Sequence, residues 1–458
     1  MDAVRAPAVA GLFYPREPHL LAREVRDFLD VAASDPLTPG FPKIVVVPHA
    51  GYIYSGPVAA PAYDLLRPAL GIVRRVVLLG PCHRVPVRGM ALPGAGAFDT
   101  PLGRIAVDRA AVGKLRADPN VADMREAHDF EHALEVQLPF LQTVLGDFSL
   151  VPLVVGAIPA QAVARVLDLL WGGDETLIVI SSDLSHYLPY EDARSMDGAT
   201  ARAIVGFDPH INHEQACGAT PLSGALLAAR QRGFGARLLD LRNSGDTAGG
   251  SSRVVGYGSF AFGTTAAQYG ADHGRRLVAL AREAVCGTRG TDRMAQDETW
   301  LREMRASFVS VKVDGALRGC VGTLEPHRPL REDVLANARA AASLDTRFAP
   351  ISEREFDRME LEVSLLSRPS RIAFEEHNEL ISQLAPGEDG LILQYGEGPA
   401  ARRGTFLPQV WESLPDPEHF IAELKRKAGI APETRTTACS IKRYRVLKWR
   451  ESELKGQA

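Results

Sequence analysis

The chain has 458 residues, of which 46% are hydrophobic and 24% are charged. This length exceeds what one ordinary hydrophobic core accommodates, so we expect two or three domains. The formal net charge of −4 gives no global attraction to nucleic acid or to an anionic membrane, and we expect neither as a partner. The basic run at 441–450 is typical of a solvated strand or helix face.

The five cysteines are scattered and contain no CxxC pair. This pattern argues against a disulfide framework and a structural zinc site, and it favours a reducing compartment. The first residues lack the long apolar core of a signal peptide, and no stretch approaches the length of a membrane-spanning helix. We therefore expect a cytoplasmic protein.

Taken in chain order, residues 40–265 alternate short β-branched runs with longer helical patterns. Strands are predicted at 43–47, 75–80, 149–155, 176–181 and 253–262. Helices are predicted at 18–32, 57–67, 108–117, 131–145, 159–170, 191–206 and 220–232. Strand–helix alternation predicts an α/β fold with a mostly parallel sheet covered by helices on both faces.

The segment at 262–274, FGTTAAQYGADHG, interrupts this alternation. We expect a first domain at 1–266, a linker at 267–275 and a second domain at 276–458. In and after the linker, the predicted elements are a helix at 274–286, a hairpin with its turn at Asp314-Gly315, a helix at 330–343, a strand at 359–367, a hairpin around Asp389-Gly390 and a helix at 417–428. This order predicts an α+β domain with an antiparallel sheet.

Three of the predicted strands end in a turn that carries a histidine: His49, His83 and His186. Each one alone is typical of a turn residue that bonds to neighbouring backbone. Open α/β sheets bind ligands beyond the carboxyl ends of their strands, and imidazole is the commonest protein ligand for iron, copper and zinc. Together the three predict a metal or acid/base site, in which Asp183 could orient an imidazole or bind directly.

Other polar residues could join this site. In HDFEHALEVQLPFL, Glu131 and His132 belong either to a solvated first helical turn or to the pocket, where they would support a ligand or bind substrate. Cys217 precedes a predicted helix, as a small packed residue or as a ligand or redox group. Asp246 lies on a Gly-rich loop; with His49 and His83 it would complete the two-histidine, one-carboxylate arrangement of non-haem iron sites.

The motifs PHAGYIYSG, LGPCHRV, EHALEVQLPFL, SSDLSHY and NSGD…SRVVGY resemble those of the MEMO family, over residues 5–265. The resemblance implies a fold similar to the class III extradiol ring-cleaving dioxygenases, with His49, His83 and His186 lining the pocket that corresponds to the iron site. Some members carry a cysteine ligand where this chain reads Gly245-Asp246-Thr247. The third ligand here would then be Asp246 or water.

The motifs LRGCVGTLEP, LDTRFAPISEREFDRMELEVSLLSRP, DGLILQYGEGPARRGTFLPQV and ELKRKAGI resemble the AMMECR1 family, over residues 272–450. Cys320 lies between two glycines, either as a packed residue or as a catalytic thiol whose pKa the nearby Arg318 could lower. Members of both families also occur beside a radical-SAM enzyme, in the AmmeMemoRadiSam system, and fusion holds the two halves at high effective concentration.

From these observations we expect a metal-dependent redox enzyme. His49, His83 and Asp246 would hold a divalent metal, Fe(II) first and Cu or Zn as alternatives. His186 would act as acid/base, with Asp183 and Cys320 as further catalytic residues. A radical-SAM enzyme is the expected partner, and the substrate is a small molecule or a peptide. The alternatives are a non-catalytic scaffold that retains a dioxygenase-like pocket, and a zinc-type hydrolase.

Overall fold

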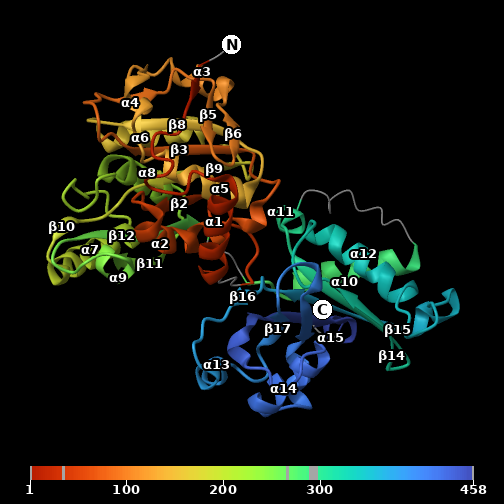
Figure 1. Ribbon diagram of the computed structural model, residues 1–458. Coiled ribbons are helices and arrows are strands. Elements are labelled where there is room, and N and C mark those ends of the chain that lie inside the picture. The colour runs from red at the N-terminus through yellow and green to blue at the C-terminus, as the bar shows by residue number, and fades with distance from the viewer. Residues whose placement is uncertain (1–2, 33–36, 265–267, 288–297, 456–458) are drawn as a thin grey trace. The chain divides into compact units, whose positions relative to one another are not determined.

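The computed structural model describes residues 3–32, 37–264, 268–287 and 298–455 (Figure 1). The chain forms two compact units. The first comprises residues 1–32 and 41–266, and the second comprises residues 33–40 and 267–458. Each unit has a hydrophobic core of its own.

A nine-stranded sheet forms the centre of the first unit. Its strand order is β10-β12-β2-β9-β3-β8-β4-β7, and β11 also pairs with β12. The bounds are β2 Ile44–Val47, β3 Arg75–Pro81, β4 Met90–Leu92, β7 Val121–Asp123, β8 Ser149–Val155, β9 Thr176–Ser181, β10 His186–Leu188, β11 Gly235–Asn243 and β12 Val254–Gly263. Strands β2, β9, β3 and β8 are parallel, and β12 joins β2 antiparallel. The predicted α/β class is confirmed.

The parallel strands are apolar because helices cover them. Every residue of β2 and of β9 is buried, as expected of a parallel sheet with both faces covered. Helices α1, α2 and α5 pack on one another, and α6 packs on α8. The helices of this unit are α1 Pro18–Ala32, α2 Tyr52–Asp64, α3 Arg109–Leu115, α4 Glu126–Asp129, α5 Leu138–Leu145, α6 Ala160–Leu170, α7 Tyr190–Val205, α8 Ala219–Gln231 and α9 Ser244–Thr247. A small sheet contains β1 Val4–Arg5, β5 Ala97–Thr100 and β6 Gly103–Ala106.

The helix predicted at 131–145 begins later than expected. A 3₁₀ turn covers Glu135–Gln137, and the α-helix starts at Leu138, with a proline in its first turn, where the missing N–H costs nothing. Residues 131 and 132 lie on irregular backbone. Glu131 and Glu135 therefore do not share a helix face, and their carboxylates bind different partners.

The second unit contains two four-stranded antiparallel sheets, ordered β14-β13-β15-β20 and β16-β19-β17-β18. The strands are β13 Ala306–Val313, β14 Ala316–Gly322, β15 Met359–Leu366, β16 Ser370–Arg371, β17 Gly390–Tyr395, β18 Arg402–Phe406, β19 Cys439–Tyr444 and β20 Val446–Arg450. The helices are α10 Ala271–Cys286, α11 Thr299–Arg302, α12 Leu330–Ser343, α13 His377–Gln383, α14 Pro417–Lys427 and α15 Glu451–Lys455. Helix α10 begins inside the segment predicted as a linker.

One predicted hairpin is confirmed and the other is wrong. Asp314 and Gly315 have φ values of 50° and 79°, as a two-residue hairpin turn requires. Asp389 and Gly390 do not form a turn between paired strands, because β17 begins at Gly390 and pairs with β18 beyond residue 396. The buried Asp389 carboxylate accepts the N–H of Ala385 at 2.9 Å.

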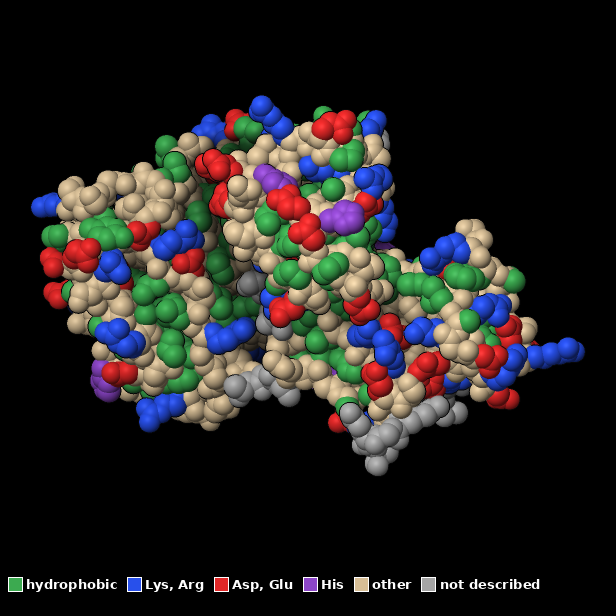
Figure 2. Space-filling model, turned by 90° about the horizontal axis from the view of Figure 1, so that it is seen from below, with side chains coloured by type: hydrophobic (Ala, Val, Ile, Leu, Met, Phe, Trp, Pro, Cys, Tyr) green, Lys and Arg blue, Asp and Glu red, His purple; other side chains and the backbone are tan. Residues whose placement is uncertain are grey.

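Acidic and basic side chains are interspersed on the face that Figure 2 shows. In the described part of the chain, no helix is both long enough and apolar enough to cross a membrane.

Candidate metal centre

Three histidines of the first unit converge at the carboxyl edge of its sheet. His49 follows β2, His83 follows β3, and His132 lies on the irregular segment before α5. One ring nitrogen from each can be chosen so that all three lie within 4.8 Å of one another. His49 is buried and His83 is exposed, so the cluster is anchored in the core and reachable from solvent.

The hydrogen bonds of Ser181 determine which nitrogen of His49 is free. The Ser181 hydroxyl donates to the carbonyl of Ala133 at 2.6 Å and accepts from Nε2 of Gln137 at 2.8 Å. Its one hydrogen is thus used, so the 2.8 Å contact with Nδ1 of His49 must be an N–H donated by the imidazole. The Nε2 atom of His49 then carries the lone pair and is the candidate metal ligand.

A carboxylate orients His83 in the same way. Nδ1 of His83 lies 2.9 Å from Oε1 of Glu131, and the backbone N–H of His83 donates to Oε2 at 2.6 Å. Although burial disfavours its ionised form, the hydrogen bond from His83 lowers the pKa of the Glu131 carboxyl to about 2. An ionised carboxylate can only accept, so His83 donates from Nδ1 and exposes the lone pair of Nε2. This carboxylate–imidazole pairing is typical of metal-binding histidines.

His132 has a buried ring nitrogen without a partner. Its Nδ1 makes no hydrogen bond and lies 3.4 Å from Oε1 of Glu131. The His132 ring stacks on that of His83, with centroids 4.8 Å apart. A buried imidazole nitrogen that lacks a hydrogen bond is costly, and a cation bound by this ring would offset that cost.

Burial keeps His49 and His132 neutral. Burial, together with the neighbouring His83, lowers the pKa of His49 to about 3. Burial, together with His49, lowers the pKa of His132 to about 4. Neutral imidazole is the form that binds metals, so His49 and His132 can accept a cation at neutral pH without first losing a proton.

Asp183 and Cys217 lie beside the Nε2 atom of His49. Oδ1 of Asp183 accepts the backbone N–H of His49 at 2.7 Å, and Oδ2 lies 4.0 Å from Nε2. The thiol sulfur of Cys217 lies 3.2 Å from Nε2 of His49. Burial raises the pKa of the Cys217 thiol to about 12, so it is protonated and donates to the lone pair of Nε2.

The structure does not group His186 or Asp246 with the cluster. His186 lies on β10, where its charge acts on Asp183 and on His49. Asp246 is exposed at the start of α9. Its carboxylate accepts the N–H of Asn243 at 2.9 Å and the hydroxyl of Tyr190 at 2.5 Å. Asp246 therefore caps a helix, and the residues that the structure groups as a possible metal site are His49, His83 and His132.

Cys320 lies in the second unit on β14. Its sulfur accepts the hydroxyl of Ser310 at 3.2 Å, and its N–H donates to Asp345 at 2.9 Å. The guanidinium of Arg318, expected to lower the thiol pKa, instead pairs with Glu355.

The chemistry of the donor set fits a transition-metal ion. Three imidazoles, two of them oriented by hydrogen bonds of their Nδ1 atoms, suit iron, copper or zinc. The fold and the cluster together define the class of the first unit: an α/β protein with a candidate metal site at the carboxyl edge of its sheet.

Comparison with known sequences gives the family. Residues 5–261 match the family described as Memo-like protein, and residues 278–449 match the family described as AMMECR1. The chain belongs to the Memo-like family and carries an AMMECR1 domain after it.

Two similar relatives are called MEMO1 family proteins. The one from Aquifex aeolicus is 36% identical over 267 residues, which cover 56% of this chain and 97% of that protein. The one from Ignicoccus hospitalis is 36% identical over 287 residues, which cover 57% of this chain and 98% of that protein. The crystal structure of an uncharacterized protein from Pyrococcus horikoshii is 31% identical, with a TM-score of 0.34, and covers 39% of this chain and 91% of that chain.

Proposed function

We propose that the Memo-like unit is a metal-dependent oxidoreductase whose metal is held by His49, His83 and His132. The convergence of three imidazoles on one point, with one ring nitrogen from each within 4.8 Å of the others, carries the proposal. The similarity in fold that the MEMO resemblance implies to class III extradiol ring-cleaving dioxygenases favours Fe(II) as the metal.

When bound, such a metal would act as a redox-active Lewis acid, with coordination positions left open for substrate. The chain's own residues hold the site in shape. Ser181 and Glu131 keep the far nitrogens of His49 and His83 protonated, which aims both lone pairs inward. We propose that His186, which is half-buried on β10, exchanges a proton with substrate.

A zinc-type hydrolase is the second candidate, and the ligand set itself favours it. Three histidines and an open position form a known catalytic zinc arrangement, whereas iron oxygenases commonly add a carboxylate. The absence of a charged ligand would leave the full charge of the cation to act on a bound substrate or water.

Metal analysis after anaerobic purification tests both candidates. We expect about one iron per chain in the wild type, and loss of it in His49→Ala, His83→Ala and His132→Ala. Asp246→Ala is the matched control and should keep the metal. Zinc at the same stoichiometry would favour the hydrolase, and a folded wild type that binds neither metal would reduce the unit to a scaffold.

We propose further that the chain acts with a radical-SAM enzyme, on the strength of the resemblance of its two halves to members of the AmmeMemoRadiSam system. Co-purification of a tagged full-length chain with a radical-SAM enzyme from the same source would support this. Failure to retain any such enzyme under anaerobic conditions would argue against it.

A further inference from the structure

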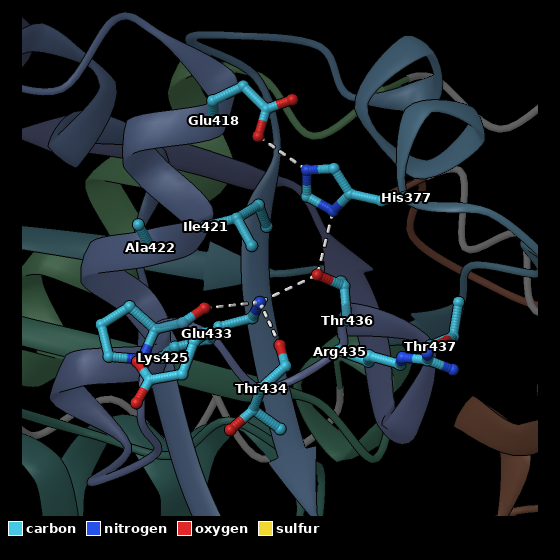
Figure 3. Close-up of a pocket in the computed structure, with 11 residues that line it drawn as sticks. His377, Glu418, Ile421, Ala422, Lys425, Glu433, Thr434, Arg435, Thr436 and Thr437 are labelled. Atoms are coloured by element: carbon cyan, nitrogen blue, oxygen red, sulfur yellow. Dashed lines mark hydrogen bonds and ion pairs between the residues drawn. The ribbon is translucent and has the colours of Figure 1, made fainter.

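A cavity of about 360 Å³ lies in the second unit between α14 and the segment at 432–437 (Figure 3). One part of its lining is apolar and comprises Ile421, Ala422 and Pro432. The other part carries groups used in acid–base and nucleophilic chemistry, namely His377, Glu418, Lys425 and Thr436. None of these residues belongs to the metal centre of the first unit.

The polar residues form one hydrogen-bonded chain. Oε2 of Glu418 lies 2.6 Å from Nε2 of His377. Nδ1 of the same ring lies 2.9 Å from the hydroxyl oxygen of Thr436. That oxygen in turn lies 2.9 Å from Nζ of Lys425. Figure 3 shows the imidazole between the carboxylate and the hydroxyl, with the lysine amine beyond the hydroxyl.

Donor counting sets the direction of these hydrogen bonds. The Lys425 side chain is buried, and its ammonium can donate three hydrogens. They reach the carbonyls of Pro432 and Thr434, at 3.3 and 2.8 Å, and the hydroxyl of Thr436. The Thr436 oxygen therefore accepts from the lysine, and its own hydrogen is left to donate to Nδ1 of His377.

The imidazole then matches a general base. With Nδ1 accepting from Thr436, its proton sits on Nε2 and is donated to the Glu418 carboxylate. A hydroxyl bonded to an imidazole that a carboxylate orients is the arrangement that activates a nucleophile. Lys425 holds the 432–436 segment through its hydrogen bonds to the carbonyls of Pro432 and Thr434. His377 joins Thr436 of this segment to the Glu418 carboxylate on α14.

We propose that this cavity is a second catalytic site, in which Thr436 is the nucleophile toward a carboxylic ester or thioester. His377 is the general base and Glu418 is a positioning residue that fixes the imidazole tautomer. Lys425 stabilises the negative charge that develops on the threonine oxygen. The apolar residues of the lining, Ile421, Ala422 and Pro432, receive the acyl group.

The reaction balances with water as the co-reactant. The Thr436 oxygen bonds to the acyl carbon while its proton passes to Nδ1 of His377. The bond from the acyl carbon to the alcohol or thiol breaks, and the leaving group takes that proton. Water then attacks the acyl carbon of the acyl-threonine while His377 accepts a proton from the water. The bond from the acyl carbon to the Thr436 oxygen breaks, and His377 returns the proton to that oxygen. A carboxylic acid is released.

The experiment uses the full-length chain and p-nitrophenyl acetate, whose acetyl group the cavity can hold. We expect a burst of p-nitrophenolate and an acetyl group on Thr436, located by peptide mapping after an acid quench. Mapping is required because the free cysteines of the chain also react with the ester. A folded wild type without acetyl-Thr436 at saturating ester would overturn the proposal.

Variants separate catalysis from structure. Thr436→Ala should lose the mapped acetyl group, Thr436→Ser should keep it, and His377→Gln should slow acylation about 10²- to 10⁴-fold. Thr437→Ala removes a neighbouring hydroxyl that also lines the cavity and should acylate as the wild type does. Glu418→Gln should shift the pH profile of acylation, with partial rescue by Glu418→Asp. Equal labelling in His377→Gln and wild type would also refute the relay.

Discussion

The thiol sulfur of Cys217 lies 3.2 Å from Nε2 of His49, the nitrogen that the Ser181 hydrogen bond leaves free for a metal. A single lone pair cannot accept the thiol hydrogen and bind a cation at once. The thiol therefore competes with the metal for the same atom.

This competition predicts the effect of Cys217→Ala. A neutral hydrogen bond contributes about 0.5–1.5 kcal/mol, so its removal should leave the metal affinity unchanged or raise it up to about tenfold. Competitive titration with a chromogenic chelator measures the affinity. A fall of more than tenfold would instead identify the sulfur as a thiolate ligand.

Glu131 should control the metal affinity without binding the metal. Glu131→Gln weakens the acceptor that holds Nδ1 of His83 at 2.9 Å, and loss of such a partner typically lowers metal affinity about 10- to 100-fold. Glu126→Gln, an exposed position five residues earlier, is the control and should bind as the wild type does. Equal affinity in the two variants would remove Glu131 from any orienting role.

His128 should make the first unit sensitive to acid. Burial lowers its pKa to about 4, against about 6.5 in an unfolded chain. The unfolded state therefore binds the extra proton first. The stability that neutral His128 contributes is fully present above about pH 6.5 and is lost as the pH falls toward 4, by up to about 3 kcal/mol.

The variant His128→Gln isolates this contribution, because a glutamine amide can still donate to the carbonyl of Ala91, which Nε2 of His128 contacts at 2.8 Å. The free energy of unfolding in urea should fall less between pH 7 and pH 4.5 in this variant than in the wild type. His19→Gln, at an exposed position of α1, should behave as the wild type does. Parallel pH curves for all three proteins would contradict the assignment.

Gly319 should tolerate no side chain. A Cβ built there would lie 1.8 Å from the carbonyl oxygen of Ala341 on α12, so the strand or the helix must move. Gly319→Ala should destabilise the second unit by about 1–3 kcal/mol, as measured by chemical unfolding. Gly113→Ala, in α3 with open space around it, should instead be neutral or stabilise by up to about 1 kcal/mol. Similar effects of the two substitutions would refute the packing argument.

The sequence predicted the five main strands of the first unit to within one residue at each end, because a strand buried on both faces is a continuous apolar run. It also predicted the approach of His49 to His83, since parallel strands deliver their ends to one edge. The position of His132 depends on the pairing of Glu131 with His83, 48 residues earlier. No local periodicity encodes such a pairing, and the helical spacing suggested a different backbone.

The structural role of Asp246 is indicated by a local sequence pattern, the spacing of a helix capping box. Asn243 and Asp246 are three residues apart, the spacing of a helix capping box, and the structure contains that box. A carboxylate engaged by the backbone at a helix start is less available to a metal. The capping pattern therefore favoured a structural role for Asp246 before any tertiary contact was known.

The segment at 37–40 belongs to the second unit, although it precedes most of the first in the chain. Leu37 is buried in the core of that unit, and the carbonyl of Thr38 accepts from Arg305 at 2.9 Å. The N–H of Gly40 donates to Glu303 at 2.5 Å. A recombination event near residue 266 would thus transfer an incomplete domain, with buried Arg305 deprived of an acceptor. The two halves cannot be exchanged as independent cassettes at that boundary.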